Sequence, residues 1–307
     1  MTGWVVDLGD VPIALRAVDA ARVAAITRLL GGLEGRSEAP QADIRYQRRR
    51  PATPRRLPSH VYQNIRVWHR GDELVVQFDD EPAGARVTSD SAWIGGPTDD
   101  LDRVFRQLFH FTVTHLLAHH DRWVLHAAGL VAEDGNAYVV VGATGQGKST
   151  LSLAAVASEW GLLADDLVVV RRGERGLEAT GIARSVAVPG DLGAVLPMAA
   201  PPIPGDQRGR RDLGVERLTR GWFPVAGVIV VGHSASEDGE LEGLAGEPTL
   251  YRVMGSFSSA TDPRLVTRFF PIAAALSRLP SWQLGHGVDA GTRLDVARRF
   301  LAELSAR

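Results

Sequence analysis

Residues 139–170, VVVGATGQGKSTLSLAAVASEWGLLADDLVVV, decide the fold of this chain. The stretch has an apolar run, a glycine-rich turn ending in Gly-Lys-Ser, a segment of helix length, and a second apolar run preceded by two adjacent aspartates. Residues 142–149, GATGQGKS, match the pattern G-x-x-x-x-G-K-[ST] at every fixed position. Because short apolar runs alternate with a helix from position 123 onward, we predict an α/β core.

A loop of this kind binds phosphate through its backbone. Glycines allow successive N–H groups to turn inward around phosphate oxygens, and the positive end of the following helix points at the same anion. Lys148 is placed to reach the β- and γ-phosphates, and the Ser149 hydroxyl to bind Mg²⁺. A chance glycine-rich turn is the alternative, but strand, lysine, hydroxyl and helix are all in place. We therefore predict that ATP, or another nucleoside triphosphate, binds with Mg²⁺ at Gly142, Ala143, Thr144, Gly145, Gln146, Gly147, Lys148, Ser149 and Thr150.

The paired aspartates, Asp165 and Asp166, stand at the start of the apolar run LVVVRRG, one helix after the loop. A magnesium aspartate of the Walker B type instead ends an apolar strand. Two adjacent carboxylates can divide the work, one orienting the metal and the other accepting a proton from an incoming hydroxyl. An Asp-Asp pair is also common as a solvated turn or a helix-exit cap, and spacing alone does not separate these readings.

Three features together carry a family resemblance: His126 in LHAAGLV shortly before the loop, the G-x-x-G-x-G-K-S loop, and the sequence Ala-Asp-Asp at 164–166. Over residues 123–170 the chain resembles the catalytic core of the HPr kinase/phosphorylase family, which is related in fold to phosphoenolpyruvate carboxykinases. The resemblance implies an α/β P-loop core of that type. It also implies catalytic roles for His126, Lys148 and Asp166, with Asp166 as proton acceptor, and metal-side roles for Ser149 and Asp165. For His126, a hydrogen-bonded core histidine is the alternative.

The resemblance stops after position 170. The family's downstream signature E-I-R-G-x-G-I, which carries a further metal-binding glutamate, has no counterpart, and ATGIARSVAVPGDLG (179–193) stands in its place. The chain is more similar to divergent HPr-kinase-related proteins, some of which phosphorylate a serine of a ribosomally made peptide precursor. The implied function is a Mg²⁺-dependent kinase that transfers the terminal phosphoryl of ATP to a hydroxyl, foremost a serine of a peptide or protein. A non-catalytic nucleotide-binding module, a small-molecule kinase and a nucleotide hydrolase stay open as alternatives.

Arginines supply candidates for a clamp on the transferred phosphoryl group: Arg208 and Arg211 in GDQRGRRDLG, and Arg184 in GIARSVAVP. A solvated charged loop is the alternative. The densest basic stretch is RYQRRRPATPRR (45–56), whose prolines forbid a regular helix. It could recruit an acidic peptide or nucleic acid, but overall charge near zero favours a mobile solvated loop. His115 and His119 have i, i+4 spacing, yet the chain has neither an H-E-x-x-H motif nor any cysteine, so we expect no metal there.

Composition narrows the class of protein. The 307 residues include 34 basic and 36 acidic side chains, a net charge of −2, and no cysteine. These values favour neither a nucleic-acid nor a membrane partner, and no apolar stretch reaches the roughly 18–20 residues of a spanning helix. We expect a cytoplasmic protein with an N-terminal α+β domain at 1–120, a candidate for substrate recognition, and a P-loop kinase domain at 121–307. The family forms oligomers, so the resemblance also allows a homo-oligomer.

The flanking regions give a coarse pattern of elements. The pattern of apolar and polar residues predicts strands at 4–16 and a helix at 19–33. It predicts mainly loop at 34–59 and antiparallel hairpins at 60–96, around Gly71-Asp72. Helical spacing returns at 99–120, at 262–279 with Pro271 inside, and at 290–306.

Overall fold

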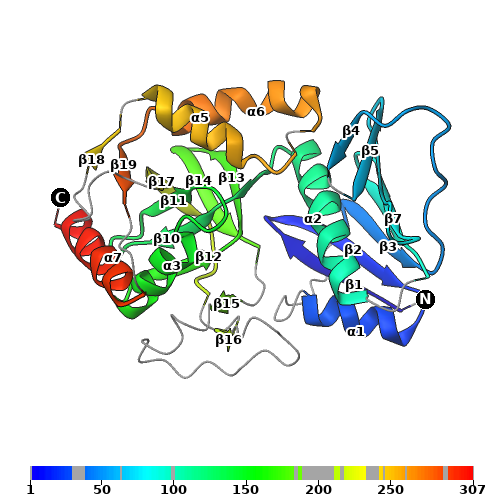
Figure 1. Cartoon of the computed structure of the whole chain (residues 1–307), viewed down its shortest axis with the longest axis horizontal. Helices are drawn as coiled ribbons and strands as arrows, with labels where there is room; N and C mark the ends of the chain where they lie inside the picture. The colour runs from blue at the N-terminus through cyan, green and yellow to red at the C-terminus, as the bar shows by residue number, and fades with distance from the viewer. Residues whose placement is uncertain are drawn as a thin grey trace. The chain divides into compact units, whose positions relative to one another are not determined.

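The chain divides into two compact units in the computed structural model, an N-terminal unit (Met1–Trp123 with Ser258–Val266) and a P-loop unit (Val124–Phe257 with Thr267–Arg307). Figure 1 shows the elements of both. The residues that the structure describes are 2–29, 39–62, 64–97, 101–182, 186–188, 211–214, 218–232, 242–244, 246–259, 261–285 and 290–306.

The N-terminal unit contains an eight-stranded sheet in the order β1-β2-β3-β8-β7-β6-β5-β4. The pairs β2–β3 and β3–β8 are parallel, and the other neighbours are antiparallel. The strands are β1 (Thr2–Leu8), β2 (Val11–Ala17), β3 (Ala42–Gln47), β4 (His60–Tyr62), β5 (Ile65–Arg70), β6 (Glu73–Phe78), β7 (Gly84–Val87) and β8 (Ser91–Gly95).

Two helices pack on this sheet, α1 (Ala20–Leu29) and α2 (Leu101–His119). Helix α2 contacts β6, β7, β8 and α1, and α1 contacts β2. Side chains alternate along β3: Ile44 and Tyr46 are fully buried, whereas Arg45 between them is exposed. The face that carries Arg45 is the polar face of the sheet, although β2 and β6 are buried at nearly every position.

The P-loop unit is built on a second sheet, nine-stranded among the described residues, with the path β12-β10-β11-β17-β14-β13-β9; β19 also pairs with β17, and β18 with β19. The pairs β11–β17 and β17–β19 are parallel. The strands are β9 (Trp123–His126), β10 (Ala128–Val131), β11 (Ala137–Val141), β12 (Gly161–Ala164), β13 (Leu167–Gly173), β14 (Gly176–Gly181), β17 (Phe223–Val231), β18 (Glu242–Gly243) and β19 (Ser281–Leu284).

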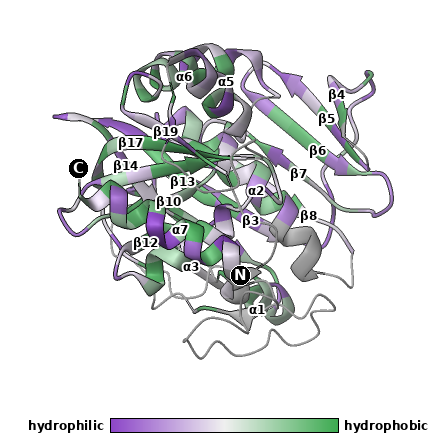
Figure 2. Cartoon of the chain, turned by 60° about the vertical axis from the view of Figure 1, so that its left-hand side comes forward, coloured by the Kyte–Doolittle hydropathy of each residue, from purple (hydrophilic) through white to green (hydrophobic). Residues whose placement is uncertain are grey.

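Helices cover this second sheet: α3 (Lys148–Ala157), α5 (Gly246–Ser256), α6 (Pro263–Leu276, whose first residues belong to the N-terminal unit) and α7 (Ala290–Ser305). Helix α3 packs on α7, β10 and β12, whereas α5 contacts β11 and β17. Strand β13 packs on β10 and β12, and its residues 167–170 are an apolar run that is completely buried. Figure 2 shows these strands in the green of hydrophobic residues.

The mixed α/β class predicted from the sequence is confirmed. The segment at 4–16 forms the β1–β2 hairpin, whose turn residues Gly9 and Asp10 both have positive φ, and Pro271 lies inside α6. Two expectations are wrong in part: the region 34–59 contains strand β3, and a helix, α5, lies where no helix is predicted. No helix among the described residues is both long and apolar enough to cross a membrane.

Candidate active site

The glycine-rich loop connects the end of β11 to the first residue of α3. Gly145 and Gly147 have φ values of 84° and 103°, in the left-handed region that favours glycine. At Gly142 a Cβ atom would lie 2.5 Å from the carbonyl oxygen of Val231, so that no side chain fits without a backbone shift. The backbone at these positions therefore needs the glycines that the sequence pattern supplies.

Two side chains of the loop fold back onto it. Gln146 Oε1 accepts a hydrogen bond from the Ala143 amide at 2.6 Å. Lys148 Nζ donates to the carbonyl oxygens of Gly142 (2.8 Å) and Ala143 (3.4 Å). Burial lowers the pKa of the Lys148 ammonium, and the nearby Asp165 carboxylate opposes this shift. The lysine is thus held at the mouth of the loop, between backbone carbonyls and a carboxylate.

Asp165 is fixed against the first turns of α3. Ser149 Oγ donates to its Oδ2 at 2.9 Å, and Ser152 Oγ donates to its Oδ1 at 2.8 Å. Ser149 and Ser152 are three residues apart and therefore lie on one face of the helix. Ser152, which is completely buried, was not predicted to belong to the site. Its spacing from Ser149 was the available signal, but a serine inside a helix has many other uses.

The donor set around Asp165 fits magnesium. Mg²⁺ prefers oxygen ligands and is commonly held by one or two protein oxygens together with substrate phosphates and water. A hydroxyl oxygen of Ser149 and a carboxylate oxygen of Asp165, 2.9 Å apart beside the phosphate loop, provide such a pair. Within the described ranges no three His, Cys, Asp or Glu side chains gather as a metal cluster.

Asp166 has a different partner from its neighbour. Its Oδ1 lies 2.6 Å from Nδ1 of His126, and its carbonyl oxygen accepts a hydrogen bond from the Ala127 amide at 3.2 Å. The two side chains are 35% and 41% exposed, so an incoming molecule can reach the pair. His126 is therefore not a buried core histidine, and the tandem carboxylates face two different groups, the loop helix and a histidine.

The position of the aspartates in the fold differs from the sequence interpretation. Helix α3 ends at Ala157, Glu159 adopts φ 63°, and strand β12 begins at Gly161. Asp165 and Asp166 occupy the turn between β12 and β13. They consequently follow one strand as well as precede another. The four residues 161–164 are too short a run to show strand periodicity.

The predicted arginines are not brought to the site by any described contact. Arg184 and Arg208 lie outside the described residues. Arg211 is in β16 (Arg211–Asp212), which pairs with β15 (Ala187–Val188) in a small separate sheet. The phosphoryl clamp is thus still a prediction for all three.

The histidines at i, i+4 belong to the N-terminal unit. Nε2 of His119 lies 3.3 Å from Nε2 of His115, which is 3.4 Å from the carbonyl oxygen of Asp72. The His69 ring lies 6.4 Å from that of His115. Burial and the neighbouring His119 lower the pKa of His115 to about 4, so His115 is neutral at neutral pH.

Comparisons with known proteins give a distant relationship. No protein-family model matches the chain, and no curated protein sequence matches it. Among solved structures, the HPr(Ser) kinase/phosphatase from Coxiella burnetii is similar, with 14% identity and a TM-score of 0.30 over 60% of this chain and 97% of that chain. This is a distant likeness of fold, and the chemistry of the site rests on its own geometry.

Proposed function

We propose that the chain is a Mg²⁺-dependent kinase that transfers the terminal phosphoryl group of ATP to a hydroxyl, foremost that of a serine in a peptide or protein. One observation carries the proposal: adjacent carboxylates at the phosphate loop have separate partners. Asp165 is bonded to Ser149 at the start of α3, and Asp166 faces His126. The second contact places a histidine-bound carboxylate beside the one at the loop, and such a group can accept a proton from a hydroxyl.

The loop residues 142–150 would bind the triphosphate with their amides and with Lys148. Mg²⁺, when bound with the nucleotide between Ser149 and Asp165, neutralises charge on the phosphates. Lys148 already lies at the mouth of the loop through its contacts with Gly142 and Ala143. Exchanging these carbonyls for phosphate oxygens would need little movement of the ammonium group.

Asp166 would act as the general base. The acceptor hydroxyl oxygen forms a bond to the γ-phosphorus while the bond from that phosphorus to the bridging oxygen breaks, and ADP leaves with that oxygen. The hydroxyl proton passes to the Asp166 carboxylate. His126 Nδ1, 2.6 Å from Asp166 Oδ1, would orient the carboxylate toward the acceptor hydroxyl. The choice of a seryl acceptor follows from the resemblance over residues 123–170.

Incubation with γ-labelled ATP and the peptide and protein products of neighbouring genes tests the proposal. We expect label on an acceptor, and about 10²–10⁴-fold slower transfer by Asp166→Asn with nucleotide affinity retained. Asp295→Asn, an exposed carboxylate on α7, is the matched control and should transfer like the wild type. Release of inorganic phosphate alone would indicate a hydrolase, and tight binding without turnover a regulatory module; either outcome contradicts the kinase.

A further inference from the structure

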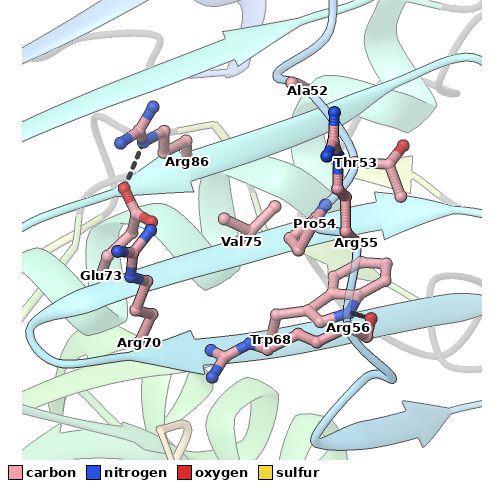
Figure 3. A pocket seen from close by; sticks show the side chains of 10 residues that line it. All are labelled: Ala52, Thr53, Pro54, Arg55, Arg56, Trp68, Arg70, Glu73, Val75 and Arg86. Atoms are coloured by element: carbon pink, nitrogen blue, oxygen red, sulfur yellow. Dashed lines mark hydrogen bonds and ion pairs between the residues drawn. The ribbon is translucent and has the colours of Figure 1, made fainter.

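A groove of about 470 Å³ lies on the polar face of the N-terminal sheet (Figure 3). Its floor includes Val75 of β6 and Trp68 of β5, and one wall is the chain segment 52–56. Four arginines line it: Arg55, Arg56, Arg70 and Arg86. The proposed phosphoryl transfer uses none of these residues.

The wall of the groove is held in place by buried polar side chains. Gln77, 3% exposed, donates from Nε2 to the carbonyl oxygen of Pro51 at 2.8 Å and accepts at Oε1 from Thr53 Oγ1 at 2.9 Å. Trp68, also 3% exposed, donates from Nε1 to the carbonyl oxygen of Arg56 at 2.9 Å. The basic segment 45–56 was expected to be a mobile solvated loop; its second half is instead anchored on the sheet. Because both polar atoms of the buried Gln77 amide are hydrogen-bonded to the segment, the cost of burying them is compensated and the segment is held in a fixed shape.

The groove has a strong excess of positive charge. One carboxylate, Glu73, lines it against the four guanidinium groups, and Arg86 pairs with that carboxylate. The Arg56 guanidinium donates to the carbonyl oxygen of His69. Within the part of the chain that the structure describes, the exposed guanidinium groups of Arg55 and Arg70 have no hydrogen-bond or ion-pair partner. These two cations are available to an anionic ligand.

The hollowed surface continues beyond this groove. A second hollow of about 320 Å³ shares Arg86 and is lined by Arg45, Trp93 and Asp43, among others. Arg86 on β7 and Trp93 on β8 are cross-strand partners, which places the two hollows side by side on the same sheet face. In the second hollow Arg45 pairs with Asp43, so among the described residues the cations of the two hollows that lack a partner are Arg55 and Arg70.

We propose that this arginine groove docks an acidic segment of the polypeptide that the P-loop unit phosphorylates; the proposal rests on the kinase function above. Carboxylates of the segment pair with Arg55 and Arg70, for which the planar guanidinium group is suited. Apolar side chains of the same segment fill the hollow over Val75 and the edge of Trp68. Nucleic acid fits less well, because the Trp68 ring is buried too deeply to stack on bases.

Fluorescence anisotropy tests the docking site without any phosphoryl transfer. The probe is a fluorescein-labelled peptide of repeated Glu-Glu-Leu triplets, with a Lys-Lys-Leu peptide as the comparison. We expect the full chain to bind the acidic peptide and not the basic one. The double variant Arg55→Glu/Arg70→Glu should bind it at least about tenfold more weakly, the loss expected for charged contacts of this kind.

The control variant, Arg252→Glu/Arg299→Glu, changes net charge by the same amount at exposed helix positions of the P-loop unit. It should bind the peptide like the wild type. Circular dichroism checks that each variant is folded, and Arg55→Gln/Arg70→Gln replaces the charge-reversal variant if that one unfolds. Three results would overturn the proposal. The groove variant, Arg55→Glu/Arg70→Glu, could bind the peptide like the wild type, or both double variants could weaken binding equally. The third result is displacement of the peptide by an unstructured thymine oligonucleotide at similar concentration.

Steady-state transfer to the physiological acceptor separates this inference from the kinase assignment. We expect the groove variant to raise KM for the acceptor and to leave kcat and ATP affinity unchanged, since docking acts on local concentration. If Asp166→Asn abolishes transfer while the groove variant has wild-type KM, the kinase stands and the groove proposal is wrong. If the acidic peptide binds at the groove but no acceptor is ever labelled, the kinase assignment is wrong and the groove remains a peptide site.

Discussion

Replacing Ser152 by alanine isolates the support that α3 gives to Asp165. The Ser152 hydroxyl is completely buried and lies 2.8 Å from Asp165 Oδ1, closer than its other acceptor, the Lys148 carbonyl oxygen at 3.1 Å. A hydrogen bond to a carboxylate contributes about 2 kcal/mol, and alanine is at least as good a helix former as serine. The Ser152→Ala substitution should therefore leave α3 intact and mainly loosen the orientation of the Asp165 carboxylate. Loss of about 2 kcal/mol in the metal-bound state corresponds to about 30-fold weaker binding of Mg²⁺–ATP, within the 10–100-fold range typical of residues that support metal ligands.

Isothermal titration of ATP with and without Mg²⁺ measures this effect. We expect the Ser152→Ala variant to lose affinity for Mg²⁺–ATP and to bind metal-free ATP like the wild type. The matched control is Ser256→Ala, a buried helix serine in α5 whose hydroxyl bonds the Val253 carbonyl at 2.8 Å, away from the loop. Unchanged Mg²⁺–ATP affinity in Ser152→Ala, or an equal loss with and without the metal, would refute the reasoning that Asp165 is the metal-side carboxylate.

Two further predictions concern the loop and the histidine pair. Gly142→Ala should weaken nucleotide binding, measured with a fluorescent ATP analogue, because its Cβ would lie 2.5 Å from the Val231 carbonyl oxygen. The control is Gly135→Ala, where a Cβ meets no atom within 4 Å; it should bind nucleotide normally but lose some stability because of its φ of 81°. Wild-type affinity in Gly142→Ala would contradict the account. His115 has a pKa of about 4 in the folded chain and 6.5 in the unfolded chain, so it is mainly neutral in both states at pH 7. As the pH falls, the unfolded chain binds the proton first. The free energy of unfolding should therefore decrease by up to about 3 kcal/mol between pH 6.5 and 4. Chemical denaturation across that range should show a smaller acid-induced loss in His115→Gln, and parallel pH profiles for the two proteins would be inconsistent with a buried neutral His115.

The phosphate loop could be predicted residue by residue because its requirements are local. Positive φ at Gly145 and Gly147 and the close approach at Gly142 belong to a single strand–turn–helix unit that the sequence pattern encodes. The meeting of Asp165 with the loop is not local. It depends on the pairing of β12 with β10. The four apolar residues of β12 are too few to predict this pairing, and only the family resemblance placed Asp165 near the loop.

The same limit explains the elements that were missed. Strand β3 pairs in parallel with β2 and β8, and Asp43 lies opposite Ser91, which is far away in the sequence. The six residues of β3 alone therefore give little signal. The basic segment 45–56 predicts a solvated loop because its sequence is dominated by arginines. Its anchors, Gln77 and Trp68, stand on strands that follow it in the chain, and no pattern within 45–56 reveals them.

The division of labour between the two aspartates is the central claim, and the Mg²⁺ dependence of ATP binding in the two isosteric variants tests it most directly. Asp165→Asn should lose most of the affinity that Mg²⁺ adds, because it removes the carboxylate bonded to Ser149. Asp166→Asn should keep that gain in full, since its carboxylate faces His126. An equal loss in both variants, or a loss in Asp166→Asn alone, would contradict the account.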